Sequence, residues 1–488
     1  MIKTPFSIRT AGIFLIFLQA GCVVGPDYHR PELTVPPTWQ GETAVGAKNR
    51  AQEKEQLASW WQSLNDPLLS VLVEEAVANN LDLKQAAAKL REARARRGLS
   101  AADRYPAVNA GAGATRNRSS EEIGAGGGSV SESYSAQFDA SWEPDIFGGK
   151  QRALEGATAT LEASQENIRD VQVSLLAEVV LNYIEIRSLQ GQLDNTRTTM
   201  ATLTETLQIT AWRNQAGLVS QLDQDQASYN LEQTRAKLPS LLSQLEQSRN
   251  NLALLLGRDS SALNELLSAG SIPVAKGEIA IGVPAETLRQ RPDIRRAERQ
   301  LAAATAQVGA AEADRYPNLS LSGTVGLQAS SLGNLLQPGA YLYSLAANTA
   351  VTIFDGGRLK QKVEIQNALQ EQAQISYQSA VRSALRDVEN ALTAYAGEQN
   401  RRSSLLEAVR LARSAAELAA SQYSAGLIDF STVLDSQRSL LSLQDQLIQS
   451  EASVTSNLAR LYKALGGGWS TSSPDITAPQ GVSSGVKS

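Results

Sequence analysis

Residues 132–143 read ESYSAQFDASWE, and their side chains alternate between two chemical types. The even positions from 134 to 142 carry Tyr, Ala, Phe, Ala and Trp, whereas every odd position from 133 to 143 is polar. A period of two is that of a β-strand with one apolar and one polar face. The segment also has the length of a tilted strand that crosses a bilayer, which takes about 9–11 residues.

Three further segments show the same alternation. Residues 318–328 place Leu319, Leu321, Val325 and Leu327 against polar neighbours, residues 107–115 alternate with smaller side chains, and residues 341–353 alternate more loosely. The low-complexity stretches 119–129 and 330–339 separate the strands of each pair. We therefore expect two β-hairpins, at about 107–144 and 318–355.

Two interpretations of these hairpins compete. A half-buried sheet covered by helices, as in soluble α+β proteins, is one. The other is a transmembrane β-barrel, and it is favoured because the polar faces are too rich in Ser, Asn and Asp for a core, while Trp142, Tyr134, Tyr341 and Tyr343 lie near strand ends. Four strands cannot close a barrel, and open edges in lipid are costly, so the barrel must be shared between chains. The residues expected to face lipid are Tyr134, Phe138, Trp142, Leu319, Leu321 and Val325.

The chain contains an internal duplication. The stretch ADRYP at 102–106 recurs at 313–317, and four further landmarks recur in the same order at offsets of 208 to 211. The expected organisation is a signal peptide (1–21), an N-terminal extension (22–80), a first repeat (81–257), a linker (258–291), a second repeat (292–466) and a partly disordered tail (467–488).

Long helices are expected in each repeat. A helix precedes each hairpin, at 81–104 and 293–315, and ends before Tyr-Pro because proline stops a helix. A double glycine then restarts a helix that continues to Gly217 or Gly426, and a second helix returns to Gly257 or Gly466. At 1.5 Å per residue the first of these would be about 100 Å long, which suits helices packed side by side in a long bundle.

The composition argues against an enzyme and against nucleic acid. The chain has one histidine, one cysteine and a net charge of −5. One His and one Cys cannot form a zinc site or a cysteine–histidine nucleophile, and an acidic chain has no electrostatic reason to bind nucleic acid. We expect no cofactor and no metal, apart from a covalent lipid.

The N-terminus has the pattern of an export signal. Lys3 and Arg9 precede a short apolar run at 11–18, and Ala20 and Gly21 precede Cys22, the only cysteine. The run is too short to span a bilayer as a helix, so a lipoprotein signal is expected, with Cys22 lipidated. Because residue 23 is Val rather than the Asp that retains lipoproteins at the inner membrane, we expect sorting to the outer membrane.

Several motifs resemble one family. They are CVVGPDY at 22–28, Trp60-Trp61 with Asp66-Pro67, RPDI at 291–294 with Ala297-Glu298, and LYKALGGGW at 461–469. These resemble the TolC-like outer membrane efflux proteins, in the OprM/NodT-like lipoprotein branch. The resemblance implies a homotrimer with a 12-stranded barrel and a 12-helix periplasmic tunnel. A mixed equatorial belt would come from the N-terminal extension, residues 264–281 and the C-terminal end. The implied partners are a periplasmic adaptor and an inner-membrane transporter, often of the resistance–nodulation–division type.

The resemblance also implies functional residues. The hairpin tips that close the periplasmic end and dock on the adaptor would be Gly217, Leu218, Val219 and Ser220, and Gly426, Leu427, Ile428 and Asp429. A gate beyond them would involve Asp435, with Ser431 one turn before it and Asp223 and Asp225 in the first repeat. Three symmetry-related carboxylates in a narrow pore would favour bound cations.

The function expected is passive conduction of small molecules by the outer membrane duct of a tripartite pump. Two alternatives stay open at this point. One is the duct of a protein-secretion system, and the other is a lipid-anchored coiled coil that bridges the envelope without conducting.

Overall fold

The computed structural model describes residues 23–32, 35–40, 54–122, 128–263, 267–268, 270–274 and 284–469. The signal peptide, Cys22, most of the 264–281 belt segment and the tail beyond Trp469 lie outside the described residues. Two compact units are each assembled from both halves of the chain: 1–31, 90–165 and 296–378 form the first, and 32–89, 166–295 and 379–488 the second.

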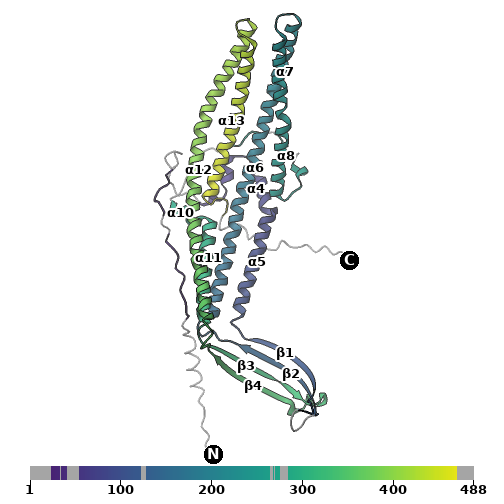
Figure 1. Cartoon of the computed structure of the whole chain (residues 1–488), viewed down its shortest axis with the longest axis vertical. Coiled ribbons are helices and arrows are strands. Elements are labelled where there is room, and N and C mark those ends of the chain that lie inside the picture. The colour runs from purple at the N-terminus through teal and green to yellow at the C-terminus, as the bar shows by residue number, and fades with distance from the viewer. Residues whose placement is uncertain are drawn as a thin grey trace, which may run out of the picture. The chain divides into compact units, whose positions relative to one another are not determined.

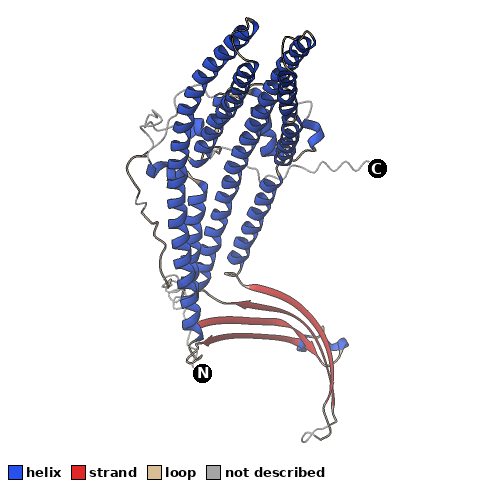
Figure 2. Ribbon diagram, turned by 45° about the horizontal axis from the view of Figure 1, so that its top comes forward, coloured by secondary structure: helices blue, strands red, loops and turns tan. Residues whose placement is uncertain are grey.

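Figure 1 labels the elements in space, and Figure 2 separates helices from strands. In chain order they are α3 Lys54–Ala58, η1 Trp60–Leu64, α4 Pro67–Asn79, α5 Leu81–Ala102, β1 Ala107–Arg118, β2 Val130–Trp142, α6 Gly149–Gln215, α7 Gln221–Arg235, α8 Lys237–Leu256, η2 Ser260–Ala262, α10 Pro284–Gln290, α11 Pro292–Ala313, β3 Asn318–Ala329, η3 Leu332–Asn334, η4 Pro338–Ala340, β4 Tyr341–Ala350, α12 Arg358–Ser424 and α13 Phe430–Ala464. Each half thus contributes a helix, two strands, a 67-residue helix and a returning helical arm.

The first unit contains the sheet. Its four strands are antiparallel in the order β1-β2-β3-β4, so the two hairpins meet where β2 pairs with β3, and β1 and β4 form the two edges. Figure 2 shows the strands side by side in one curved sheet. The four strands and their pairing into two hairpins are as the alternation predicts.

The fourth strand is shorter than expected. The alternation suggested a strand over 341–353, but β4 ends at Ala350, whose partner is Asn318, the first residue of β3. Pro317 precedes Asn318 and has no backbone N–H to donate, so the ladder stops there. Residues 351–354 therefore leave the sheet before α12 begins.

The second unit is a helical core. Leu69, Leu72 and Val73 of α4 are fully buried, as are Leu176 and Tyr183 of α6. Asp66 starts α4 by accepting a hydrogen bond from Leu69 N at 3.1 Å, and it also accepts one from the Tyr183 hydroxyl at 2.5 Å. Burial, and secondarily the bond to Asp66, raises the pKa of Tyr183 to about 12.

Two of the sequence motifs have structural roles in this core. The Trp60 ring stacks on Tyr462 with centroids 5.1 Å apart, so the paired tryptophans meet the LYKALGGGW segment. The Gly468 amide donates to the Leu57 carbonyl at 2.9 Å, and a Cβ on Gly467 would lie 2.9 Å from that same oxygen. The glycines are needed because the two backbones approach closely.

The returning arm of the first half is divided. A single helix was expected back to Gly257, but α7 ends at Arg235 and α8 begins at Lys237. Pro239 has no amide hydrogen, so the Arg235 carbonyl loses its usual partner and the helix is interrupted at Ala236. The second half has no proline there, and α13 runs for 35 residues without a break.

Among the described residues, no helix combines the length and the apolar character needed to cross a membrane.

Candidate functional site: sheet face, leader dock and hairpin tips

The strand register brings the apolar side chains onto one face of the sheet. One row across the four strands consists of Ala110, Phe138, Val325 and Tyr343, and the row beside it consists of Ala112, Ala136, Leu327 and Tyr341. The six residues expected to face lipid all fall on this face: Tyr134, Phe138, Trp142, Leu319, Leu321 and Val325. The alternation within each segment and the pairing between strands therefore identify the same face of the sheet as apolar.

The opposite face is hydrogen-bonded and polar. Asp139 accepts a hydrogen bond from Thr324 Oγ1 at 2.7 Å and from Gln137 Nε2 at 3.0 Å. Gln328 Nε2 donates to the Ser133 hydroxyl at 3.0 Å. The contacts of Thr324 and Gln328 join β3 to β2 through side chains, and this face has the chemistry of a surface that meets water.

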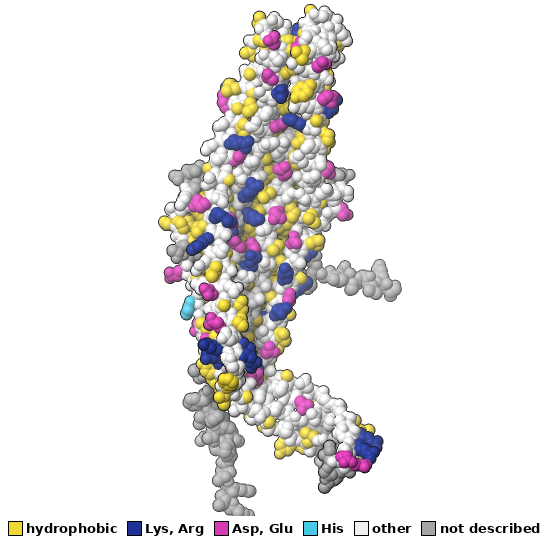
Figure 3. All heavy atoms as spheres, viewed as in Figure 1, with side chains coloured by type: hydrophobic (Ala, Val, Ile, Leu, Met, Phe, Trp, Pro, Cys, Tyr) yellow, Lys and Arg dark blue, Asp and Glu magenta, His cyan; other side chains and the backbone are white. Residues whose placement is uncertain are grey.

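The apolar face is open rather than covered. Phe138 is 58% exposed and Tyr343 is 76% exposed. A soluble α+β protein would place helices over such residues, so that interpretation of the hairpins is wrong. Figure 3 shows charged side chains gathered at the loop end of the sheet, where Arg116 pairs with Glu132 at 3.4 Å and Arg118 with Glu121 at 2.9 Å.

A short N-terminal segment, residues 23–30, is docked where the sheet joins the helices, and we call it the leader. Val24 N donates to the Phe147 carbonyl at 3.1 Å. Arg152 of α6 donates to the carbonyls of Val24 and Gly25, and to Asp27 Oδ1 at 2.7 Å. The hydrogen bond and charge of Arg152 lower the pKa of Asp27 below its usual value.

The leader packs against Gly309, a position of α11 that has no side chain. Gly25 adopts φ +89°, and a Cβ built on it would lie 2.3 Å from the Cα of Gly309. A Cβ on Gly309 would in turn lie 3.0 Å from the Arg152 side chain. No sequence motif predicted a role for Gly309 or Arg152, although a lone glycine inside an alanine-rich helix is a signal of close approach.

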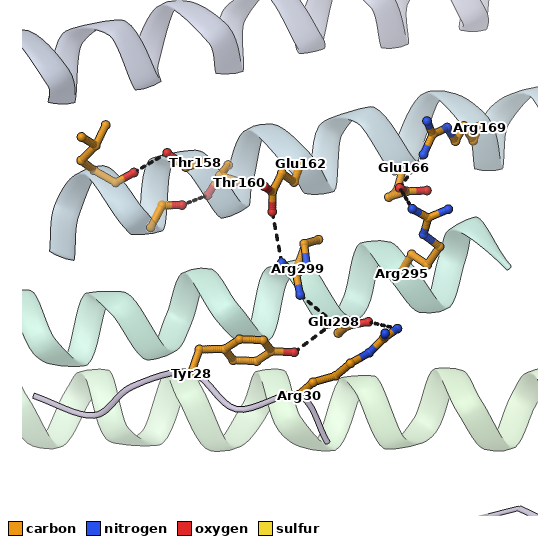
Figure 4. Close-up of polar contacts among 12 residues, drawn as sticks. Tyr28, Arg30, Thr158, Thr160, Glu162, Glu166, Arg169, Arg295, Glu298 and Arg299 are labelled. Carbon is orange, nitrogen blue, oxygen red and sulfur yellow. Dashed lines mark hydrogen bonds and ion pairs between the residues drawn. The ribbon is translucent and has the colours of Figure 1, made fainter. Parts of the chain in front are cut away.

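A network of charges holds the end of the leader, as Figure 4 shows. Glu298 of α11 is buried and accepts from the Tyr28 hydroxyl at 3.2 Å, from Arg30 at 2.8 Å and from Arg299 at 2.6 Å. Arg299 also reaches Glu162 of α6 at 3.2 Å. Burial, and after it the Glu298 charge, raises the pKa of Tyr28 to about 12. The Ala297-Glu298 motif and the CVVGPDY motif are therefore in contact, because Glu298 of the first accepts a hydrogen bond from Tyr28 of the second.

The first hairpin tip is a compact helix-to-helix turn. Gly217 adopts φ +70°, and the Leu218 amide bonds back to the Arg213 carbonyl at 2.8 Å, which closes the end of α6. Ser220 starts α7 with a capping box: its hydroxyl receives the Asp223 amide, while the Asp223 carboxylate receives the Ser220 amide at 3.0 Å. Leu218 is exposed at the turn, and Val219 is half-buried between it and the cap.

The second tip repeats the turn with a different start. Gly426 adopts φ +74°, the Leu427 amide bonds to the Gln422 carbonyl at 2.9 Å, and Leu427 is exposed. Asp429 occupies the N-cap position of α13 but makes no side-chain capping bond. Ile428 instead packs against a small buried cluster that includes Phe430 and Val433.

The four candidate gate residues differ in their surroundings. Asp223 is engaged in the capping box, and Asp225 accepts from Gln221 Nε2 at 2.9 Å. The Asp435 side chain is 75% exposed and lies 3.8 Å from Arg438, and Ser431 is exposed one turn before it. Asp435 also borders a groove of about 760 Å³ whose lining includes Lys237. Of the three carboxylates, Asp435 is the most available to a solute or ion.

The combination of a sheet with one apolar and one polar face and paired 67-residue helices defines the class of an outer membrane channel. The chain matches the outer membrane efflux protein family over residues 72–258 and 283–467, and it belongs to that family. The family match spans both halves, as the internal duplication requires.

Known relatives are similar over almost the whole chain. Toluene efflux pump outer membrane protein TtgF of Pseudomonas putida is 31% identical over 474 residues, which cover 96% of this chain and 98% of that protein. Outer membrane protein OprJ of Pseudomonas aeruginosa is 32% identical over 472 residues, with 96% and 97% covered. The solved structure of the outer-membrane channel OprN has a TM-score of 0.88 at 35% identity, covering 92% of this chain and all of that one.

These similarities confirm the fold class and function that the sequence predicts. The chain is an outer membrane efflux channel of TolC-like fold, in which long helices form a tunnel and strands contribute to a β-barrel. Its place is the bacterial outer membrane, and its family consists of channel proteins rather than enzymes. Neither a secretion duct nor a non-conducting bridge is favoured by the relatives.

Proposed function

We propose that three copies of this chain form one channel that serves as the exit duct of a tripartite efflux pump. The observation that carries the proposal is the four-stranded sheet with an apolar face, a polar face and two free edges, β1 and β4. In lipid each unpaired backbone group at an edge costs several kcal/mol, so the sheet has to be closed by other chains. Three chains give 12 strands, with the apolar face toward lipid and the polar face toward water.

The channel has no energy source of its own in this proposal. An inner-membrane transporter, of the resistance–nodulation–division type, drives the transport, and a periplasmic adaptor connects it to the tips at 217–220 and 426–429. Exposed Leu218 and Leu427 support this, because each presents an apolar side chain on a turn whose backbone bonds are satisfied. Since TtgF is named for toluene efflux, we propose small organic molecules as cargo.

We also propose that Cys22 carries a lipid, the only non-protein group expected. Cys22 lies outside the described residues, but its neighbour Val23 lies against Gly148, at the point where β2 gives way to α6. An acyl chain attached there would start at the end of the sheet, beside the lipid that contacts its apolar face. Such an anchor adds about 0.8 kcal/mol per buried CH₂.

We propose that Asp435 forms the periplasmic gate, with Ser431 one turn before it. Three copies of this exposed carboxylate around a threefold axis would bind cations at the narrowest part of the pore, where a bound divalent ion impedes flow. Asp223 and Asp225 are secondary candidates, because both already accept hydrogen bonds within α7.

Conductance in planar lipid bilayers tests this function. Wild-type protein should conduct and should be partly blocked by added Mg²⁺, whereas Asp435→Ala should conduct more and lose the block. Glu407→Ala is the matched control, since Glu407 is an exposed carboxylate on α12 that pairs with Arg410. Absence of any conductance in the wild type would support an inert bridge, and an unchanged Mg²⁺ block in Asp435→Ala would remove Asp435 from the gate.

A further inference from the structure

An aromatic contact joins the two halves of the chain at the end of the sheet. Phe147, just after β2, stacks on Tyr316, just before β3, with ring centroids 4.9 Å apart and planes 23° apart. The stack lies beside the β2–β3 pairing, which is the one place where strands from different halves meet. It borders a hollow of about 500 Å³ that Pro317 and Val351 also line.

Each partner has a counterpart in the other half of the chain, but the two counterparts do not meet. Ile146-Phe147 recurs 207 positions later as Ile353-Phe354 after β4, and Tyr316-Pro317 corresponds to Tyr105-Pro106 before β1. Phe354 is 90% exposed and Tyr105 is 73% exposed. These residues lie next to the two edge strands of the sheet, so one half of an aromatic stack is exposed at each edge.

Closure of the shared barrel pairs β4 of one subunit with β1 of the next. We propose that this pairing uses the register of β2 with β3, and that Phe354 stacks on the partner subunit's Tyr105. The inference rests on the oligomeric channel of the preceding section and specifies its subunit interface. Such an interface is heterologous, and it closes into a ring when the rotation between subunits is the same at each step.

The duplication fixes the register of this pairing. The counterpart of a β2 residue lies 207 positions later, in β4, and the counterpart of a β3 residue lies 211 positions earlier, in β1. The β2–β3 pair Phe138–Val325 therefore corresponds to the pair Leu345–Ala114 between subunits, and the pair Ala140–Gly323 corresponds to Ala347–Ala112. The pairings within the chain place Ala112, Ala114, Leu345 and Ala347 on the apolar face. The derived register therefore keeps apolar beside apolar around the ring, whereas a slip of one residue would reverse it.

The Ile-Phe pair recurs at an offset of 207, whereas the double glycine that follows it recurs at an offset of 208, because the second half has one additional residue between them. Asp355 stands between Phe354 and the double glycine, whereas Phe147 is followed directly by Gly148. Asp355 accepts hydrogen bonds from the Gly357 and Leu359 amides, both at 2.8 Å, and so caps α12. In the first half Asp145 caps α6, by accepting from Gln151 N at 2.7 Å. The added residue changes the cap and leaves the Ile-Phe pair aligned with its strand.

Disulfide trapping tests the register in the full-length channel in membranes. Cysteines at Ala112→Cys and Ala347→Cys would be directly opposite across the interface, with Cβ atoms about 4.5–5.5 Å apart, close enough to crosslink after a small adjustment. The control pair Ala112→Cys with Leu345→Cys lies on the same face but two residues out of register, at about 7–8 Å. We expect covalent oligomers on non-reducing denaturing gels from the first pair alone.

Removal of the stack gives a second readout. Phe354→Ala should make the oligomer dissociate about tenfold faster on heating, because an aromatic pair and its buried area are lost at every interface. Leu336→Ala, an equally exposed residue of the 330–340 loop, should leave dissociation unchanged.

The outcomes separate this inference from the proposed function. If a conducting oligomer forms but the out-of-register pair crosslinks instead, or Phe354→Ala dissociates like the wild type, the interface assigned here is wrong and the channel stands. If the wild-type protein neither oligomerises nor conducts, the proposed function itself fails.

Discussion

Replacing Gly25 with alanine tests how the leader is held. Two features of this position exclude a side chain. The φ of +89° is a conformation that L-residues avoid, and the new Cβ would lie 2.3 Å from the Cα of Gly309 on α11. Because the obstructing atom belongs to a helix backbone, no side-chain rotation can relieve the contact.

The expected cost follows from these two terms. A left-handed conformation costs a non-glycine residue about 1–2 kcal/mol, and overpacking against a rigid neighbour costs about 1–3 kcal/mol. Their sum, about 3 kcal/mol, raises the population of the undocked leader roughly a hundredfold. The leader would then lose the Arg152 bonds to Val24, Gly25 and Asp27 for part of the time.

Hydrogen–deuterium exchange of a peptide covering residues 23–32 measures this change. The Val24 amide, which bonds to the Phe147 carbonyl, should exchange about a hundredfold faster in Gly25→Ala. Gly98→Ala in α5 is the control, because a Cβ there meets nothing within 4 Å. Equal protection of Val24 in the wild type and in Gly25→Ala would refute the account of the leader dock.

Two further predictions concern the first tip and the leader network. Ser220→Ala removes the capping box and should weaken the start of α7 by about 1 kcal/mol, which would appear as roughly fivefold faster amide exchange there. The control Ser431→Ala removes no cap and should leave amide exchange unchanged. Equal effects of the two substitutions would contradict the capping role of Ser220. Because the folded pKa of Tyr28 is raised to about 12, its contribution to leader docking is complete below pH 10 and is lost between about pH 10 and 12. An ultraviolet difference titration of wild type against Tyr28→Phe should show one tyrosine ionising near the top of that window, and Glu298→Gln should shift it downward.

The strands could be predicted because their pattern is local. The alternation of Tyr134, Phe138 and Trp142 with polar residues identifies β2 without knowledge of its partners. The main differences are at strand ends: β1 continues to Arg118 beyond the expected 115, and β4 stops at Ala350 before the expected 353. The difference at the end of β4 arose because strand length depends on pairing, and Pro317, directly before the neighbouring strand β3, ends the ladder.

The leader dock could not be derived in the same way. Its contacts join positions more than a hundred residues apart, such as Asp27 with Arg152 and Arg30 with Glu298. No periodicity marks such residues, and the motifs that contain several of them indicated a family without indicating a contact. Likewise, Asp223 was predicted as a gate candidate, but its carboxylate accepts a hydrogen bond from the Ser220 amide, three residues earlier, in the cap of α7.

The interruption at Ala236 has a consequence for how an opening could widen. Each subunit has one returning arm divided near Pro239 and one that is continuous over 35 residues. In a threefold assembly the jointed and the stiff arms would alternate around the circumference. We expect the divided arms to bend more than the continuous ones. The opening at the periplasmic end would then widen at three positions and have a three-lobed outline instead of a circular one.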